Sequence, residues 1–418
     1  MNVPSGDFMA GRMNVIEREQ GAARMSRPVY LDHAATTPVD PRVAAAMVQC
    51  LTAEGEFGNP ASASHSYGDA AGALVETARA QVAAAVGAAP SEVFWTSGAT
   101  EANNLAIFGV AQYYREYGRH LVTARTEHKA VLDPCRELER RGWRVTYLAP
   151  DGGGVIHPDQ VAAALQADTV LVSIAQVNNE IGVIQDISAI GAVCAKHGGA
   201  RLHVDAAQSV GKIAVDFAAL GADLMSLSAH KVYGPKGVGA LLVSRRGSPQ
   251  DRERVQLTPL QFGGGQERGL RAGTVATHQV VGMGLAFELA RTAPPSEVER
   301  IAVLRERLWQ GLAPLGGILR NGDAKHSVPH LLNVSFEGVE GESLLAAVRG
   351  RVAISTGSAC TSALQQPSYV LRALGRDDIL SESSLRFGLG RGTSESDIDT
   401  AVAAVAQAVS RLRKIGGA

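Results

Sequence analysis

The feature that most constrains the fold is a regular alternation of short apolar runs with helix-forming segments over residues 93–243. Strands are predicted at 93–96, 120–123, 144–148, 169–176, 201–205, 222–227 and 238–243, and helices at 99–108, 130–141, 158–165 and 187–197. A strand–helix repeat of this kind predicts an α/β fold whose mostly parallel sheet is covered by helices on both faces. Ligands of such sheets gather at the carboxyl ends of the strands, so site residues are expected there.

The flanking segments indicate further parts. A strand at 28–32 and helices at 41–51, with Asp40-Pro41 as the start signal of the first, and at 67–86 precede the repeat. Beyond Pro294-Pro295 the pattern changes to an α+β one, with helices at 298–312, 341–348 and 395–412 and strands at 331–336, 352–354 and 383–388. We therefore predict a poorly ordered N-terminal arm (1–27), a segment that packs with the small domain (28–39), a large domain (40–292) and a small C-terminal domain (293–418).

Composition excludes several classes of function. The chain has 418 residues, of which 45% are hydrophobic and 19% charged, and its net charge is -1. No basic excess points to nucleic acid, and no apolar run reaches the roughly 18 residues that cross a bilayer. Residues 1–27 mix both charges without an apolar stretch, unlike a secretory signal. The four cysteines have no C-x-x-C spacing, which disfavours a metal knuckle or a disulfide framework and fits a reducing cytoplasm.

Lys231 and Asp205 each follow a predicted strand of the sheet, so their side chains can meet at one edge. An amine beside a buried strand is costly unless it is paired or loses its charge, for example as a Schiff base with a carbonyl cofactor. A carboxylate at a strand end needs a cation or an N–H donor. Each residue alone has a plainer interpretation, Lys231 as a solvated surface residue and Asp205 as a helix cap.

The segment Ser97–Glu101 follows a strand and begins a helix, where free backbone N–H groups and the helix dipole favour an anion. Thr100 adds a hydroxyl, although a Thr cap with an acidic first turn is the simpler interpretation. Neither G-x-x-x-x-G-K-[ST] nor G-x-G-x-x-G follows the first strand, which disfavours ATP and NAD. An amine, a carboxylate and an anion nest on one edge match pyridoxal 5'-phosphate, and Gln208 could reach a cofactor oxygen.

With these residues in place, the chain resembles the cysteine desulfurases of the IscS/NifS type, which are fold-type-I pyridoxal phosphate enzymes. The resemblance extends from Pro28 to the end of the chain. It is carried by Tyr30–Asp32, Ala35–Pro38, Phe57–Ser62, Thr96–Glu101, Thr126–Val131, Val177–Gly182, His230–Gly237 and Gly357–Thr361. Ala229 stands where relatives often have glycine. The resemblance implies the fold-type-I architecture, with a seven-stranded sheet in a large cofactor-binding domain and a smaller α+β domain.

The resemblance also implies roles for individual residues. Lys231 matches the Schiff-base lysine, His128 the histidine stacked on the cofactor ring, and Cys360 the thiol that accepts sulfur. Cys360 lies in a run of small residues, on a loop at about 355–366. Asn179 and Arg386 match the substrate-carboxylate residues. The remaining cofactor contacts implied are Ala99, Thr100, Asp205, Gln208, Ser228, His230 and, from the other subunit of a homodimer, Thr274.

The implied reaction converts L-cysteine to L-alanine and leaves a persulfide on Cys360 for iron–sulfur cluster assembly, with tRNA thiolation as another outlet. The implied partners are an iron–sulfur scaffold protein or another sulfur acceptor. No resident metal is expected, although Cys360 could transiently ligate a cluster with the scaffold. The alternatives are a selenocysteine lyase, another aminotransferase-like pyridoxal phosphate enzyme, or a non-enzymatic sulfur-relay subunit. Cys50, Cys135 and Cys194 are expected on helices as small core residues.

Overall fold

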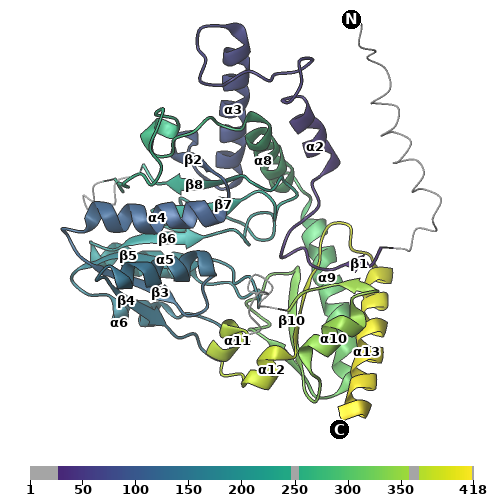
Figure 1. The fold of residues 1–418 in the computed structure, drawn as a ribbon. Coiled ribbons are helices and arrows are strands. Elements are labelled where there is room, and N and C mark those ends of the chain that lie inside the picture. Colours follow the sequence, from purple (N-terminus) through teal and green to yellow (C-terminus); the bar gives the residue numbers. More distant parts are fainter. Residues whose placement is uncertain (1–26, 246–253, 357–366, 417–418) are drawn as a thin grey trace, which may run out of the picture.

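The computed structural model describes residues 27–245, 254–356 and 367–416 (Figure 1). The predicted N-terminal arm, except Arg27, and Cys360 with most of its predicted loop lie outside the described residues. Among the described helices, none is both long and apolar enough to cross a membrane.

The centre of the fold is a seven-stranded sheet. Its order is β2 (Val93–Thr96), β8 (Gly239–Val243), β7 (Leu224–Ser228), β6 (Arg201–Asp205), β5 (Thr169–Ala175), β3 (His120–Ala124) and β4 (Arg144–Leu148). The strands from β7 to β4 are parallel, whereas β8 runs antiparallel to both of its neighbours. The predicted mostly parallel sheet is confirmed.

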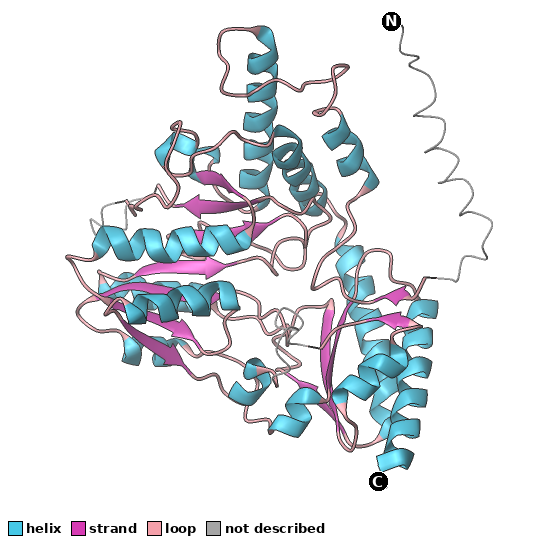
Figure 2. Ribbon diagram, in the orientation of Figure 1, coloured by secondary structure: helices cyan, strands magenta, loops and turns pink. Residues whose placement is uncertain are grey.

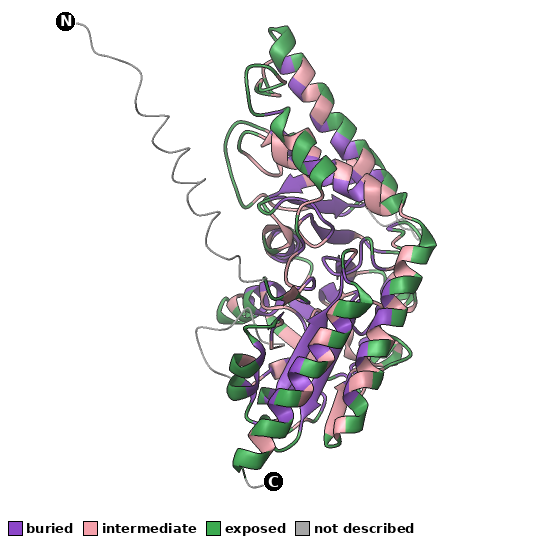
Figure 3. Ribbon diagram, turned by 90° about the vertical axis from the view of Figure 1, so that its right-hand side faces the viewer, coloured by how far each residue is buried: buried purple, intermediate pink, exposed green. Residues whose placement is uncertain are grey.

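Helices cover both faces of this sheet, as Figure 2 shows. One face packs against α4 (Ala99–Tyr114) and α5 (Lys129–Arg140). The other packs against α3 (Ser66–Ala85), α6 (Pro158–Ala164), α7 (Ile187–His197) and α8 (Thr277–Arg291). Because side chains from both layers meet the strands, the sheet residues are mostly buried, except in the edge strand β4, while the outer helix faces are exposed (Figure 3).

Helix α8 was not predicted from the sequence. It packs against α3 and α2 (Pro41–Val48). At the α3–α8 crossing, a Cβ added to Gly284 would lie 2.6 Å from Ala78 Cα. The two backbones therefore approach so closely that only glycine fits at this position.

The second, smaller sheet is antiparallel, in the order β12 (Ser384–Gly388), β10 (Leu331–Phe336) and β9 (Ile318–Asn321). Its core includes apolar side chains of α9 (Pro295–Leu312), α10 (Gly341–Val348) and α13 (Glu395–Gly416). The remaining elements are short: β1 (Val29–Tyr30), β11 (Val352–Ala353), α11 (Tyr369–Ala373), α12 (Asp378–Glu382) and the 3-10 turns η2 (Pro90–Glu92), η3 (Glu267–Gly269) and η4 (Ala313–Leu315). Strand β9 was not predicted, and the helix predicted to end at Phe108 continues to Tyr114. The domain boundaries themselves stay a prediction.

The segment before α2 connects the core of the smaller sheet to the turn before Lys231 at the larger sheet. Strand β1 pairs with β11, and Leu31 belongs to the core of the smaller sheet. A few residues later, Thr37 N–H and Oγ1–H both donate to the carbonyl of His230, at 2.8 and 2.9 Å. This segment is therefore anchored to the small core at one end and to the turn before Lys231 at the other.

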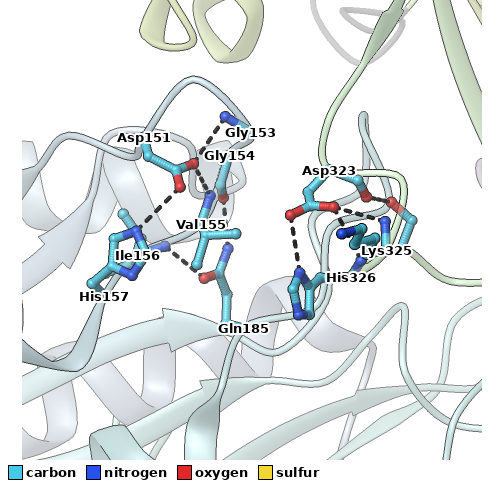
Figure 4. A network of polar contacts seen from close by, with 11 residues as sticks. Asp151, Gly153, Gly154, Val155, Ile156, His157, Gln185, Asp323, Lys325 and His326 are labelled. Atoms are coloured by element: carbon cyan, nitrogen blue, oxygen red, sulfur yellow. Dashed lines mark hydrogen bonds and ion pairs between the residues drawn. The ribbon is translucent and has the colours of Figure 1, made fainter.

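A second connection is a polar network between two turns (Figure 4). The amide of Asp323 donates to the carbonyl of Gly153 at 2.8 Å. Each turn is stabilised by its own aspartate, since Asp151 accepts from His157 and Asp323 accepts from His326. The network ties the loop after β4 to the loop after β9.

Candidate active site

A cavity of about 690 Å³ opens at the carboxyl ends of the parallel strands. The structure brings most of the sequence-predicted site residues onto its wall: Ala99, Thr100, His128, Asn179, Asp205, Gln208, Ser228, His230, Lys231 and Arg386. Their roles there remain predictions. The sequence-based expectation that Asp205 and Lys231 meet at one edge follows from the topology, since β6 and β7 are adjacent and parallel.

Two predicted residues are not on this wall. Cys360 lies outside the described residues. Thr274 is exposed and does not line the cavity. Its loop is nevertheless tied to the cavity, because Arg271 forms an ion pair with Glu101 on the cavity wall, with 2.8 Å between Nε and Oε1.

The first turn of α4 forms one end of the cavity. Gly98 caps this helix without a side-chain hydrogen bond, and a Cβ added there would meet nothing within 4 Å. The Ser97 amide donates to Glu101 Oε2 at 2.8 Å. Burial opposes ionisation of Glu101, but hydrogen bonds from Arg271 and Ser97 outweigh it and lower its pKa. A helix start whose backbone N–H groups have no side-chain cap, with open space beside it, suits an anionic group such as a phosphate.

Asp205 is the last residue of β6 and is 7% exposed. Its Oδ1 accepts from the Ala207 amide at 2.9 Å, and its Oδ2 accepts from Asn103 Nδ2 at 2.7 Å. Asn103 lies on α4, is 1% exposed and also lines the cavity. Sequence reasoning missed Asn103; the available signal was an amide within a helix whose neighbours are mainly small and apolar.

Gln208 contributes an unused acceptor. Its Nε2 donates to the carbonyl of Ala34 at 2.9 Å, which fixes the amide. Its Oε1 is buried and has no hydrogen-bond partner among the described residues. A buried carbonyl oxygen on a cavity wall is costly unless a ligand donates to it.

His128 caps α5, because its Nδ1 accepts from the Ala130 amide at 3.1 Å. The proton of the neutral ring is therefore on Nε2. Burial lowers the pKa of His128, and the nearby charge of Lys231 lowers it further. The ring is thus favoured in its neutral form.

The turn that carries Lys231 is tightly held. Burial, together with the charges of Lys231 and Lys236, lowers the pKa of His230 to about 4. Tyr233 has a φ of 61°, an uncommon conformation for a residue with a bulky side chain. Its amide donates to Thr37 Oγ1 at 2.8 Å, which stabilises the turn.

Arg386 projects from β12, also lines the cavity and is 3% exposed. Its Nη1 donates to the carbonyl of Asn179 at 2.9 Å. Its Nη2 donates to Asp32 Oδ1 at 3.0 Å and to Ser355 Oγ at 2.8 Å. Asp32 and Ser355 were not predicted as site residues, because they come near Arg386 only when the chain folds.

Together these residues fit pyridoxal phosphate. The open helix start suits its phosphate, the Asp205 carboxylate its protonated ring nitrogen, the free Gln208 Oε1 its ring hydroxyl and Lys231 its aldehyde. Fold and site thus define a pyridoxal phosphate enzyme of fold type I.

Comparison with known proteins agrees with this assignment to the pyridoxal phosphate enzymes. Residues 29–401 match the family model Aminotransferase class-V. The chain is 54% identical over 391 residues to "Cysteine desulfurase IscS" of Pectobacterium atrosepticum, covering 94% of this chain and 95% of that protein. A solved "NIFS-LIKE PROTEIN" superposes with a TM-score of 0.82 at 35% identity, covering 93% and 99% of the two chains. The structure "SspA in complex with cysteine" superposes with a TM-score of 0.75 at 38% identity, covering 86% and 98%. The chain therefore belongs to the class-V aminotransferase family and, within it, to the pyridoxal phosphate-dependent cysteine desulfurases.

Proposed function

We propose that this chain removes sulfur from L-cysteine with Cys360 as the first acceptor. The Cys360 thiol and L-cysteine yield a Cys360 persulfide and L-alanine. The substrate C–S bond breaks, an S–S bond forms, and a proton takes the place of sulfur on the carbon atom. The observation that carries this proposal is the joining of Lys231, Asp205 and Arg386 on one cavity wall.

The cofactor would be held by residues that already face the cavity. We assign its phosphate to Ala99 and Thr100 at the start of α4, with Ser228 and His230 beside them, and its ring to Asp205 and Gln208. When bound covalently to the substrate amine, pyridoxal phosphate withdraws electrons from the carbon atoms next to that amine.

We assign the proton transfers of the reaction to Lys231 and His128. We assign to the Lys231 amine the removal of the proton from the substrate α-carbon and the delivery of a proton on the way to alanine. His128 is neutral and has its Nδ1 committed to a backbone amide, so Nε2–H is the end that can face the cofactor and share a proton with the substrate.

The substrate carboxylate would lie against Arg386 and Asn179. The Arg386 guanidinium supplies a positive charge and an Nε–H with no partner among the described residues, so it can fix the orientation of the substrate carboxylate as well as match its charge. Described residues on both sides of Cys360 contact Arg386 or a neighbour of Asn179. Ser355 is hydrogen-bonded to Arg386, and Ser368 donates to Glu180, the neighbour of Asn179, at 2.5 Å.

We assign the protein to the cytoplasm and to a homodimer in which Thr274 contacts the cofactor phosphate of the other subunit. The exposure of Thr274 and its absence from its own cavity support the dimer. Cys50, Cys135 and Cys194 are buried and form no disulfide among the described residues, which supports a reducing compartment. The sulfur acceptor would be an iron–sulfur scaffold protein or another carrier.

The test is to incubate the holoenzyme with L-cysteine and a reductant, and to measure alanine and sulfide. Cys360→Ala should lose sulfide release by about a thousandfold or more, while L-cysteine still changes the cofactor's visible absorbance. Cys194→Ala is the matched control, since this residue is buried on α7 and forms no disulfide among the described residues. Normal sulfide release by Cys360→Ala would rule out Cys360 as the acceptor.

A further inference from the structure

Asp32, Ser355 and Arg386 form a closed triangle of hydrogen bonds, and Asp32 and Arg386 line the cavity. Arg386 Nη2 donates to both partners, and Ser355 Oγ–H donates to Asp32 Oδ1 at 3.0 Å. The backbone supports the same arrangement, because the amide of Arg386 donates to the carbonyl of Ser355 at 2.7 Å. Asp32 is itself held next to β12, where it forms a β-bridge with Gly388.

A count of donors shows what this triangle leaves available. A guanidinium has five N–H donors. Two of those on Arg386 are held by Asp32 and Ser355, and a third by the Asn179 carbonyl. That leaves one N–H on Nη1 and the N–H of Nε, and Nε is buried and has no partner among the described residues. An unsatisfied N–H of a buried cation is costly, so its acceptor is expected from a ligand.

Asp32 also supplies the countercharge. Its carboxylate forms the ion pair with Arg386 at 3.0 Å and lines the cavity, with 20% of the side chain exposed. The other acid near Arg386 is Glu180. Burial raises the pKa of Glu180, although its hydrogen bond from Ser368 and the charge of Arg386 oppose this rise. The carboxylate in direct contact with the Arg386 guanidinium is that of Asp32.

We infer that Asp32 is a positioning residue: with Ser355 it fixes the plane of Arg386 so that Nε–H meets the carboxylate of the amino-acid substrate. This inference rests on the proposed function and deepens it, because it states why the site selects amines that carry an α-carboxylate. The opposite role is that Asp32 merely competes with the substrate for Arg386. The two roles predict opposite signs when Asp32 is removed.

The experiment measures ligand affinity of the holoenzyme from the cofactor's visible absorbance. L-Alanine carries the carboxylate and ethylamine lacks it. In Asp32→Ala, affinity for L-alanine should fall roughly ten- to a hundredfold, the usual cost of a lost charge-assisted hydrogen bond. Asp32→Asn keeps an acceptor oxygen and Ser355→Ala keeps the charge, so both should lose less. Affinity for ethylamine should stay unchanged in all three variants.

The control is Asp323→Asn. Asp323 stabilises the loop after β9, where it accepts a hydrogen bond from His326 (Figure 4), but it does not line the cavity. It should leave both affinities as in the wild type. In steady-state assays with L-cysteine, KM should rise more than kcat falls in Asp32→Ala.

The inference is overturned if Asp32→Ala binds L-alanine as well as or more tightly than the wild type, or if ethylamine loses the same factor. Because alanine binding requires no desulfuration, the result is independent of sulfur transfer. Failure of the proposed function would instead appear as absence of alanine formation from L-cysteine by the wild type.

Discussion

Lys212 gives a quantitative test of the physical reasoning. It follows β6 and is 8% exposed. Its ammonium lies 5.2 Å from the centre of the ring of Tyr233, which belongs to the turn that carries Lys231. Burial lowers the pKa of Lys212 from 10.5 to about 8; the charge of Arg391 adds to this effect and that of Glu297 opposes it. The folded protein therefore binds this proton less tightly than the unfolded chain does.

The sign and size of the effect follow from proton linkage. Since the pKa is lower in the folded state, the unfolded chain holds more protons between about pH 8 and 10.5, and stability rises with pH over that window. The penalty at pH 7 is on the order of 3 kcal/mol, of which about 2 kcal/mol is relieved by pH 9.5. Lys212→Met keeps the apolar stem and removes the charge, so it should be more stable than the wild type at pH 7.

The measurement is urea unfolding of the holoenzyme, followed by circular dichroism at pH 7 and pH 9.5. The stability advantage of Lys212→Met should shrink by about 2 kcal/mol between the two pH values. Lys196→Met, at an exposed position on α7, serves as the control and should show no such change. An advantage that is absent at pH 7, or equal at both pH values, would refute a strained buried charge.

Two further variants test the cofactor site. Asn103→Ala should raise the dissociation constant for pyridoxal phosphate roughly tenfold in a titration of the apoenzyme, because Asp205 loses a hydrogen-bond donor. The control is Asn104→Ala, which should change this constant little. The Asn104 side-chain amide donates to the Thr100 carbonyl on the exposed side of α4. Thr274→Ala should also weaken cofactor binding if the subunits share their sites, whereas Thr292→Ala, at the exposed end of α8, should not. Light scattering of the wild type should report a dimer. A monomer with normal cofactor affinity would contradict the shared site.

The central sheet was largely predictable because strand–helix alternation is a local pattern. Each strand of the larger sheet follows from a short apolar run in the sequence. Helix α8 was missed because its glycines and polar residues blur the helical periodicity, and it is its packing on α3 that stabilises it. Strand β9 was missed because it is short and only half-buried, and its pairing with β10 defines it.

The sequence by itself determined the chemistry available to this protein: a lysine and an aspartate that each follow a strand, a helix start that can hold a phosphate, and motifs typical of cysteine desulfurases. Only the tertiary structure decided which groups act together. The contact between Asn103 and Asp205 depends on how α4 lies on the sheet. The triangle joins Asp32 to Ser355 and Arg386, which lie more than three hundred positions away from it, and no local pattern specifies it. The physical reason is that hydrogen bonds act over about 3 Å, so they are set by strand order and packing and not by distance along the chain.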